Sequence, residues 1–191
     1  MNNREIDDQT LISSYLQGNE EGFSMLYERY KGLLYSYLNR MLPNDPAKAD
    51  DLFQQTWIKA IDRLSSYEHR QQFGSWLLRI AHNLTIDCFR KNKRMAQYEA
   101  GSRDDPDFSH ADPADTGNEP WQRMHRQEIM KALKQALDQL SPEMREVFLL
   151  RKENISFKEI AEIQKCSINT VLSRMQYALK NMRNILTSWK S

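Results

Sequence analysis

The side chains best suited to binding a ligand lie near the C-terminus of this 191-residue chain, in a segment without acidic residues. Residues 165–191 contain two arginines and three lysines, which give a local charge of +5. Amide and hydroxyl groups can read base edges, and basic groups can neutralise phosphates. We predict that one helix presents six such side chains to DNA: Asn169, Thr170, Ser173, Arg174, Tyr177 and Lys180.

A helix-turn-helix pattern would position this helix. Ser156 and Glu159 have the spacing of a capping box, in which each side chain satisfies a free backbone amide of the other. The chain then turns at Lys165 and Cys166, and Ser167 can cap the next helix. Lys165 stands where glycine is common, so we expect a left-handed backbone there at some strain.

Packing of the second helix on the first also follows from residue size. Ala161 is small enough to let two helices cross closely, and Val171 can anchor the second helix. Two short helices at a steep angle present the second to a major groove, although a plain helical hairpin is the alternative. We expect helix two to bury Val171, Met175, Ala178, Leu179 and Met182. Apolar spacing predicts two more helices upstream, at 129–140 and from Ser141–Pro142 onward.

A second basic cluster, at residues 79–94, has a local charge of +4. It falls on the outer face of a helix expected at 74–94, after a loop that contains aromatic residues. Basic groups beside aromatic rings suit single-stranded nucleic acid, because bases stack and phosphates are neutralised. The alternative is that Tyr67, Phe73 and Trp76 are core residues. The candidate contacts are Tyr67, Arg79, Asn83, Asp87, Arg90 and Lys91.

The N-terminal half reads as a helical bundle. Apolar residues recur at three- and four-residue steps over residues 23–41, which predicts a helix of about 20 residues. Gly18 ends a shorter helix, Asn19 is a plausible N-cap, and Asp45–Pro46 starts the next helix. Strand-like alternation is absent from the sequence, so we predict an all-α fold.

An acidic stretch separates the two halves. Residues 95–120 have a local charge of −6, and prolines and glycines interrupt any helical pattern. We therefore predict two helical domains, at 1–95 and 123–191, joined by a flexible acidic linker at 96–122.

Several classes of protein are excluded by what the sequence lacks. No apolar run is long enough to span a membrane, and the first residues do not form a secretory signal. Cys88 reads as a core residue, and the four histidines form no metal-ligand pair. No nucleophile–base constellation or phosphate loop appears. We expect no catalytic residue, no metal and no cofactor, and a cytoplasmic location.

Taken together, these segments resemble a bacterial RNA polymerase sigma factor of the extracytoplasmic-function group. Residues 49–57 (ADDLFQQTW) look like the family's core-polymerase-binding motif. Residues 76–87 (WLLRIAHNLTID) look like its −10 promoter segment. Residues 160–163 (IAEI) and 169–174 (NTVLSR) look like its −35-reading helix-turn-helix.

The resemblance implies a role for each motif. Asp50, Asp51, Gln54 and Gln55 would bind the clamp helices of the polymerase β′ subunit. The helix at 74–94 and the loop before it would recognise and melt the −10 region, and the C-terminal domain would bind the −35 duplex. The implied partners are core polymerase, including its β flap, promoter DNA and an anti-sigma factor, and the free chain would be a monomer that does not insert into a membrane.

Three residues depart from the family pattern. Lys48 stands where an acid is usual, Lys165 replaces the turn glycine, and Leu172 replaces a common lysine, which removes a phosphate contact. Promoter preference therefore cannot be transferred from relatives. The alternative function is an autonomous dimeric helix-turn-helix regulator, which predicts a palindromic operator.

Overall fold

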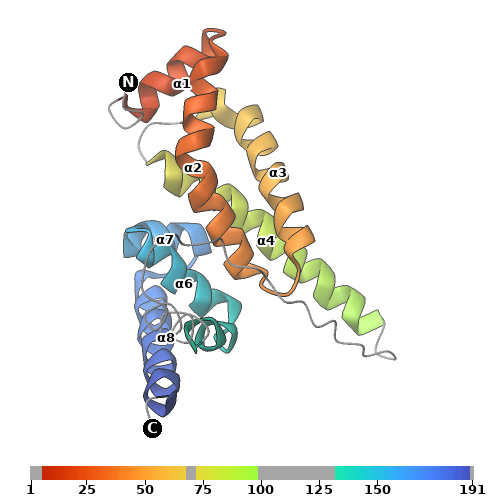
Figure 1. The fold of residues 1–191 in the computed structure, drawn as a ribbon, viewed down its shortest axis with the longest axis vertical. Helices are drawn as coiled ribbons and strands as arrows, with labels where there is room; N and C mark the ends of the chain where they lie inside the picture. The colour runs from red at the N-terminus through yellow and green to blue at the C-terminus, as the bar shows by residue number, and fades with distance from the viewer. Residues whose placement is uncertain (1–5, 68–71, 99–131, 190–191) are drawn as a thin grey trace, which may run out of the picture. The chain divides into compact units, whose positions relative to one another are not determined.

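The computed structural model describes residues 6–67, 72–98 and 132–189, with side chains at 6–67, 72–92 and 132–184. Every regular element in these ranges is a helix (Figure 1), which confirms the predicted all-α class. The helices form two compact units, here called the N-terminal domain and the C-terminal domain. The last N-terminal helix continues to Tyr98, and the rest of the linker predicted at 96–122 lies outside the described residues.

The N-terminal domain is organised around one long central helix. Its elements are α1 (Asp8–Leu16), α2 (Glu20–Met41), α3 (Pro46–Arg63), the short 3₁₀ turn η1 (Leu64–Ser66) and α4 (Phe73–Tyr98). Helix α2 packs against α1, α3 and α4. Leu26, Leu34 and Leu38 of α2 are fully buried, as are Leu77 and Leu78 of α4. The predicted apolar spacing therefore identifies the core of this domain.

The helix ends of this domain follow the predicted signals. Gly18 has a φ of +95°, a conformation that favours glycine, and it ends the turn after α1. The side chain of Asn19 accepts a hydrogen bond from the Glu21 amide at 3.0 Å, and Asp45 accepts one from the Lys48 amide at 2.9 Å. Gly22 is needed for a different reason, since a Cβ there would lie 2.5 Å from the Leu11 carbonyl oxygen.

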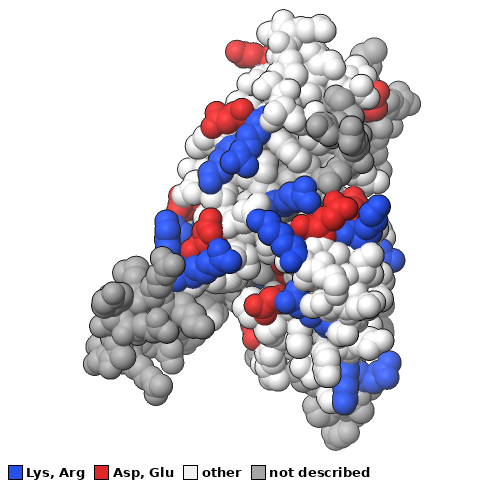
Figure 2. All heavy atoms as spheres, turned by 180° about the vertical axis from the view of Figure 1, so that it is seen from behind, with Lys and Arg blue, Asp and Glu red and all other residues white. Residues whose placement is uncertain are grey.

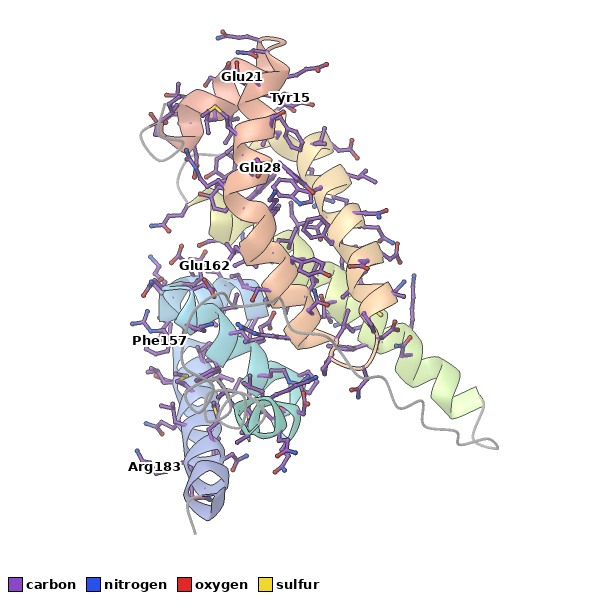
Figure 3. All side chains as sticks on the ribbon, in the orientation of Figure 1. Tyr15, Glu21, Glu28, Phe157, Glu162 and Arg183 are labelled. Atoms are coloured by element: carbon purple, nitrogen blue, oxygen red, sulfur yellow. The ribbon has the colours of Figure 1, made fainter. Side chains whose placement is uncertain are left out.

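Aromatic rings fill the space between α2 and α3 (Figure 3). Phe23 meets Trp57 edge-on with centroids 5.6 Å apart, and Tyr27 contacts Trp57 at 5.1 Å. Phe53 joins this network through Tyr27 and Tyr35. Such ring pairs add to the stabilisation that comes from burial alone, so α3 rests on a broad apolar support. On α4, Cys88 is buried as predicted, and burial raises the pKa of its thiol.

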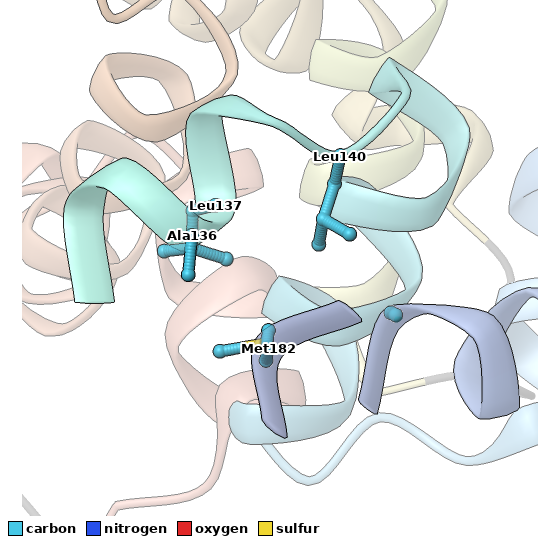
Figure 4. Packing of buried hydrophobic residues seen from close by; sticks show 5 residues of the cluster. Ala136, Leu137, Leu140 and Met182 are labelled. Carbon is cyan, nitrogen blue, oxygen red and sulfur yellow. The ribbon is translucent and has the colours of Figure 1, made fainter. Parts of the chain in front are cut away.

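The C-terminal domain has fewer described residues, and its buried apolar side chains are aliphatic. Its elements are a helix at 132–138, α6 (Pro142–Lys152), α7 (Phe157–Gln164) and α8 (Ile168–Trp189). One core cluster joins the first of these helices to α8 and contains Ala136, Leu137, Leu140, Ala178 and Met182 (Figure 4). The prediction that Leu179 is buried is wrong, because its side chain is 46% exposed. Val171, Ala178 and Met182 line the buried side of α8, and Leu179 lies around the helix from them.

A buried arginine closes one end of this core. Arg145 of α6 donates from Nε to the Leu137 carbonyl at 2.9 Å and from a terminal nitrogen to the Asp138 carbonyl at 3.0 Å. These carbonyls belong to the end of the helix at 132–138, where backbone acceptors have no partner within the helix. Burial lowers the pKa of Arg145, and the nearby Asp138 carboxylate opposes that effect.

Candidate protein- and nucleic-acid-binding surfaces

The predicted polymerase-binding residues lie together on the outer side of α3. The inner side buries Ala49, Leu52, Thr56, Trp57 and Ala60. Asp50 and Gln54 are exposed, and Asp51 and Gln55 are half-exposed. The helical repeat places Asp50 one turn before Gln54 and Asp51 one turn before Gln55, and we call these four side chains the α3 ridge. The structure therefore brings all four predicted residues to one surface.

Hydrogen bonds within the helix hold the central carboxylate of the α3 ridge. Lys48 donates from Nζ to Asp51 at 2.6 Å, and Gln55 donates from Nε2 to the other carboxylate oxygen at 2.8 Å. The bond from Lys48, followed by the bond from Gln55, lowers the pKa of Asp51, and the Lys48 pKa is raised in turn. The departure noted at Lys48 thus places a cation on a predicted binding residue.

Two exposed isoleucines extend the α3 ridge, and the sequence reasoning missed both. Ile58 is 59% exposed and Ile61 is 37% exposed. Ile58 follows Gln54 by four residues, so it lies on the same side of the helix, opposite the core. The sequence did contain a signal for them, because an apolar residue on the solvent-facing side of an amphipathic helix indicates a contact surface. The surface therefore combines fixed polar groups with exposed apolar area.

The predicted −10 residues on α4 also share one side of their helix. Asp87, Arg90 and Lys91 are exposed, and Arg79 and Asn83 are half-buried. The Asn83 side-chain amide donates to the Arg79 carbonyl at 2.9 Å, and Arg90 lies 3.8 Å from the Asp87 carboxylate. Both contacts lie within the helix, and the four-residue steps from Arg79 through Asn83 and Asp87 to Lys91 align the side chains in a row.

Tyr67 differs from the other predicted −10 residues because it is buried. Its ring meets Phe73 edge-on at 5.7 Å and contacts Trp76 at 5.0 Å, and burial raises the pKa of its hydroxyl. Tyr30 of α2 contacts Phe73 at 5.1 Å, so these rings form part of the core. Tyr67 is therefore a core residue in this conformation, which was the alternative to a DNA contact. Its ring would have to leave the core to stack on a base. The neighbouring loop residues 68–71 lie outside the described residues.

The predicted helix-turn-helix forms with the expected cap and turn. The Ser156 hydroxyl accepts a hydrogen bond from the Glu159 amide at 3.2 Å, and the Glu159 carboxylate accepts one from the Ser156 amide at 3.0 Å. Lys165 adopts the left-handed conformation, with φ 51° and ψ 46°. The Cys166 amide then donates to the Ala161 carbonyl at 3.0 Å and closes the end of α7.

Four of the six predicted −35 residues project from α8, namely Asn169, Ser173, Tyr177 and Lys180. Thr170 and Arg174 are half-buried instead, and each is engaged beside the turn. The Thr170 hydroxyl lies 2.9 Å from the Ser167 hydroxyl, and Arg174 donates to the Cys166 sulfur at 3.5 Å. These two side chains therefore support the turn as well as border the exposed face.

The charge on α8 is of one sign. Its described side chains include Arg174, Lys180 and Arg183 and no acid. Arg183 points away from the helix in Figure 3, and Figure 2 shows blue without red among the coloured residues at the lower end, where α8 ends. On the visible face of the N-terminal domain both signs occur (Figure 2). A polyanion is therefore the expected ligand of α8.

Neither a metal-binding cluster nor a membrane-spanning helix occurs in the part of the chain that the structure describes. No group of three or more His, Cys, Asp or Glu side chains there could hold a metal ion. No helix within the same residues has the length and apolar character needed to cross a membrane.

Comparison with known proteins decides which family combines these surfaces. The sigma-70 region 2 family model matches residues 26–95, and the sigma-70 region 4 family model matches residues 130–182. The chain belongs to the sigma-70 family of sigma factors. Relatives place it in the extracytoplasmic-function (ECF) group. The two matches cover most of the two helical domains, so this sigma factor recognises promoters and binds DNA through its helix-turn-helix.

The similar proteins cover nearly the whole chain. The ECF RNA polymerase sigma-E factor of Escherichia coli (strain K12) is 28% identical over 187 residues, which is 94% of each chain. The RNA polymerase sigma-H factor of Pseudomonas aeruginosa is 29% identical over 170 residues, which is 88% of each chain.

Two solved structures share the fold of this sigma factor. The sigma factor RpoE in complex with the anti-sigma factor NepR from Bartonella quintana matches with a TM-score of 0.70 and 26% identity, covering 86% of this chain and 96% of that chain. CnrH in complex with the cytosolic domain of CnrY matches with a TM-score of 0.65 and 22% identity, covering 95% and 97%. The second likeness concerns the fold alone.

Proposed function

We propose that this sigma factor divides promoter recognition between its two domains. Residues 1–95 bind the clamp helices of the polymerase β′ subunit through the α3 ridge and contact the −10 region through α4. Residues 123–191 read the −35 duplex through α8 and meet the β flap, and residues 96–122 link the domains. The protein acts in the cytoplasm by binding rather than by catalysis.

The α3 ridge is the observation that carries the polymerase-binding part of the proposal. Its carboxylate is held by two hydrogen bonds, and its helix is backed by the aromatic network of Phe23, Tyr27 and Trp57. The bond from Gln55 orders the Asp51 carboxylate, so this side chain loses little entropy on binding, whereas the Lys48 cation must be displaced. Exposed Ile58 and Ile61 add apolar area of the kind found at the centre of protein interfaces.

The DNA-binding part of the proposal rests on two small faces. The exposed part of each face supplies few phosphate contacts, so each face alone binds weakly. Core polymerase ties the two faces to one promoter and raises their effective concentration there. We therefore propose that the free chain is a monomer with low affinity for promoter duplexes.

An anti-sigma factor is the proposed regulatory partner. The RpoE structure from Bartonella quintana contains the anti-sigma factor NepR. By similarity, we assign this chain a partner that covers its polymerase- or DNA-binding surfaces until transcription is required.

Core association tests the proposal most directly. Purified chain is mixed with sigma-free bacterial core polymerase and analysed by size-exclusion chromatography. We expect co-elution near one-to-one stoichiometry, and we expect Asp51→Arg to reduce the affinity at least 100-fold because it reverses a charge in the α3 ridge. Glu28→Arg is the matched control, since Glu28 is an exposed acid of α2 outside the ridge.

The same experiment distinguishes a sigma factor from an autonomous dimeric regulator. A free chain that elutes as a dimer, does not bind core and selects palindromic duplexes would be an autonomous regulator. A folded Asp51→Arg variant with unchanged core affinity would remove the α3 ridge from the interface, and circular dichroism establishes that the variant is folded.

A further inference from the structure

The start of α8 carries exposed apolar side chains among its DNA-facing polar groups. Leu172, the fifth residue of the helix, is 38% exposed. It follows Asn169 by three residues and precedes Gln176 by four, so all three share one side of the helix. Asn169 and Gln176 are both exposed. A leucine therefore stands within the surface that we assign to base reading.

A leucine side chain can recognise only one feature of a major groove. It cannot neutralise a phosphate or hydrogen-bond to a base edge, but it can pack against the C5-methyl group of thymine. The first residues of a recognition helix are those that approach base edges most closely. We propose that Leu172 contacts a thymine methyl group in the −35 element and so makes this sigma factor select thymine at that position.

Duplex DNA is a better occupant of this position than a partner protein helix. The described side chains of α8 include Arg174, Lys180 and Arg183 and are free of acidic groups, which favours a polyanion. Ser173, the next residue, is exposed and can bond to a neighbouring base edge. The inference rests on the proposed reading of the −35 duplex by α8.

Leu179 provides a matched control on the same helix. It is also an exposed leucine, and it lies seven residues after Leu172, on the same side and about 10 Å farther along the axis. A partner helix lying along α8 would contact both leucines. A base contact made from the first turns of α8 involves Leu172 and not Leu179.

The experiment uses the holoenzyme, reconstituted from the full chain and core polymerase. Duplexes with a randomised −35 region are selected for binding by the wild-type, Leu172→Ala and Leu179→Ala proteins. We expect the wild-type protein and Leu179→Ala to enrich thymine at a common position. We expect Leu172→Ala to lose that preference while keeping its preferences elsewhere.

Deoxyuridine then tests the methyl group itself, because it differs from thymidine only by lacking that group. Replacing the selected thymidine with deoxyuridine should weaken wild-type binding about fourfold, the equivalent of about 0.8 kcal/mol for one buried carbon group. The same replacement should not affect Leu172→Ala. Leu172→Lys should bind more tightly to every sequence and lose the thymine preference.

The possible failures are distinguishable. If the wild-type protein selects a −35 sequence but binds the deoxyuridine duplex as tightly as the thymidine duplex, the methyl contact is overturned and the proposed function stands. Equal losses for Leu172→Ala and Leu179→Ala would also overturn it, in favour of a protein partner on α8. If no −35 sequence is enriched, reading by α8 fails and the inference fails with it.

Discussion

The two domains differ in what supports their binding surfaces. In the N-terminal domain the α3 ridge is backed by aromatic rings, and its carboxylate is held by contacts within the same helix. In the C-terminal domain α8 rests on a small cluster that includes Ala136, Ala178 and Met182. The orientation of α8 depends on the capping box at the start of α7 and on the left-handed Lys165 at its end.

This difference separates two ways of positioning a functional helix. A wide apolar support distributes its stabilisation over many contacts, so the loss of one polar group changes little. In the C-terminal domain the buried apolar side chains are aliphatic, and the polar contacts of Arg145 and Ser156 set how the short helices before α8 meet, so the loss of one of them should displace α8. We therefore expect DNA binding by α8 to be more sensitive than polymerase binding by α3 to single substitutions that remove a supporting contact outside the binding surface.

Removing Arg145 should have the largest effect. Arg145→Ala leaves the Leu137 and Asp138 carbonyls without their donor and creates a cavity, and we expect a loss of about 3 kcal/mol in the stability of the C-terminal domain. Hydrogen exchange of the full chain should show faster exchange across residues 132–184 and no change in α2 or α3.

Arg151 of the same helix is the control for this prediction. It is exposed and donates to the Ile155 carbonyl at 3.2 Å, so Arg151→Ala should cost less than about 1 kcal/mol. Comparable exchange rates in the two variants would contradict the view that one buried arginine closes the core.

Helix caps allow the same change to be compared in both domains. Ser156→Ala and Asn19→Ala each remove a side-chain acceptor from a helix N-terminus, at a cost of about 1 kcal/mol in unfolding free energy. The effects on binding should differ. Ser156→Ala should weaken promoter binding by the holoenzyme, because α7 leads directly into the turn before α8, whereas Asn19→Ala should leave core association unchanged.

Urea unfolding measures the two stabilities, and filter binding and size exclusion measure the two functions. If Asn19→Ala weakened core association as much as Ser156→Ala weakens promoter binding, the N-terminal surface would also depend on single polar contacts. The comparison between the domains would then fail.

Much of this arrangement was predictable from local patterns. The caps at Asn19 and Ser156, the start at Asp45 and the left-handed Lys165 each depend on one or two neighbouring residues, and all four appear as predicted. Side-chain burial was harder to predict, because it depends on which elements meet. Leu179 fits the apolar repeat of α8, but the small core does not extend to it.

The candidate sites show the same limit. Spacing along a helix was enough to align Asp50 with Gln54 and Asn169 with Ser173, since the helical repeat alone sets their common face. Spacing left open whether Tyr67 contacts DNA or belongs to the core, and in the structure Tyr67 packs against Phe73 and Trp76. That contact joins the residue after η1 to the start of α4, and the folded path of the chain between them determines it.

Replacing Lys165 with glycine should stabilise the turn of the C-terminal domain. Lys165 has a φ of 51°, and a side chain with a Cβ is strained in this region, so Lys165→Gly should raise the unfolding free energy by about 1 kcal/mol. Asn154 is the matched control, with a φ of 62°. Asparagine tolerates this conformation better than lysine, so Asn154→Gly should gain less. Urea unfolding of the two variants gives the comparison, and a larger gain at Asn154 would contradict it.

The smallest expected effect is at Lys48, whose cation pairs with Asp51 in the α3 ridge. Lys48→Met removes the charge but keeps a long side chain. The pair is solvent-exposed, so the urea midpoint should change little. The pKa of Asp51 should rise toward its ordinary value, which NMR titration of the carboxyl carbon measures, because the bond from Lys48 is the main cause of its lowering. A lowered carboxyl pKa stabilises the folded state above that pKa, so any difference in stability between wild type and Lys48→Met should vanish as the pH falls through it.

Core affinity should rise about threefold, because the carboxylate no longer has to exchange an internal cation for one on the polymerase. Lys59→Met, which removes another exposed lysine of α3, should leave both the Asp51 pKa and the core affinity unchanged. A fall in core affinity on Lys48→Met would mean that Lys48 positions Asp51 for binding instead of competing for it.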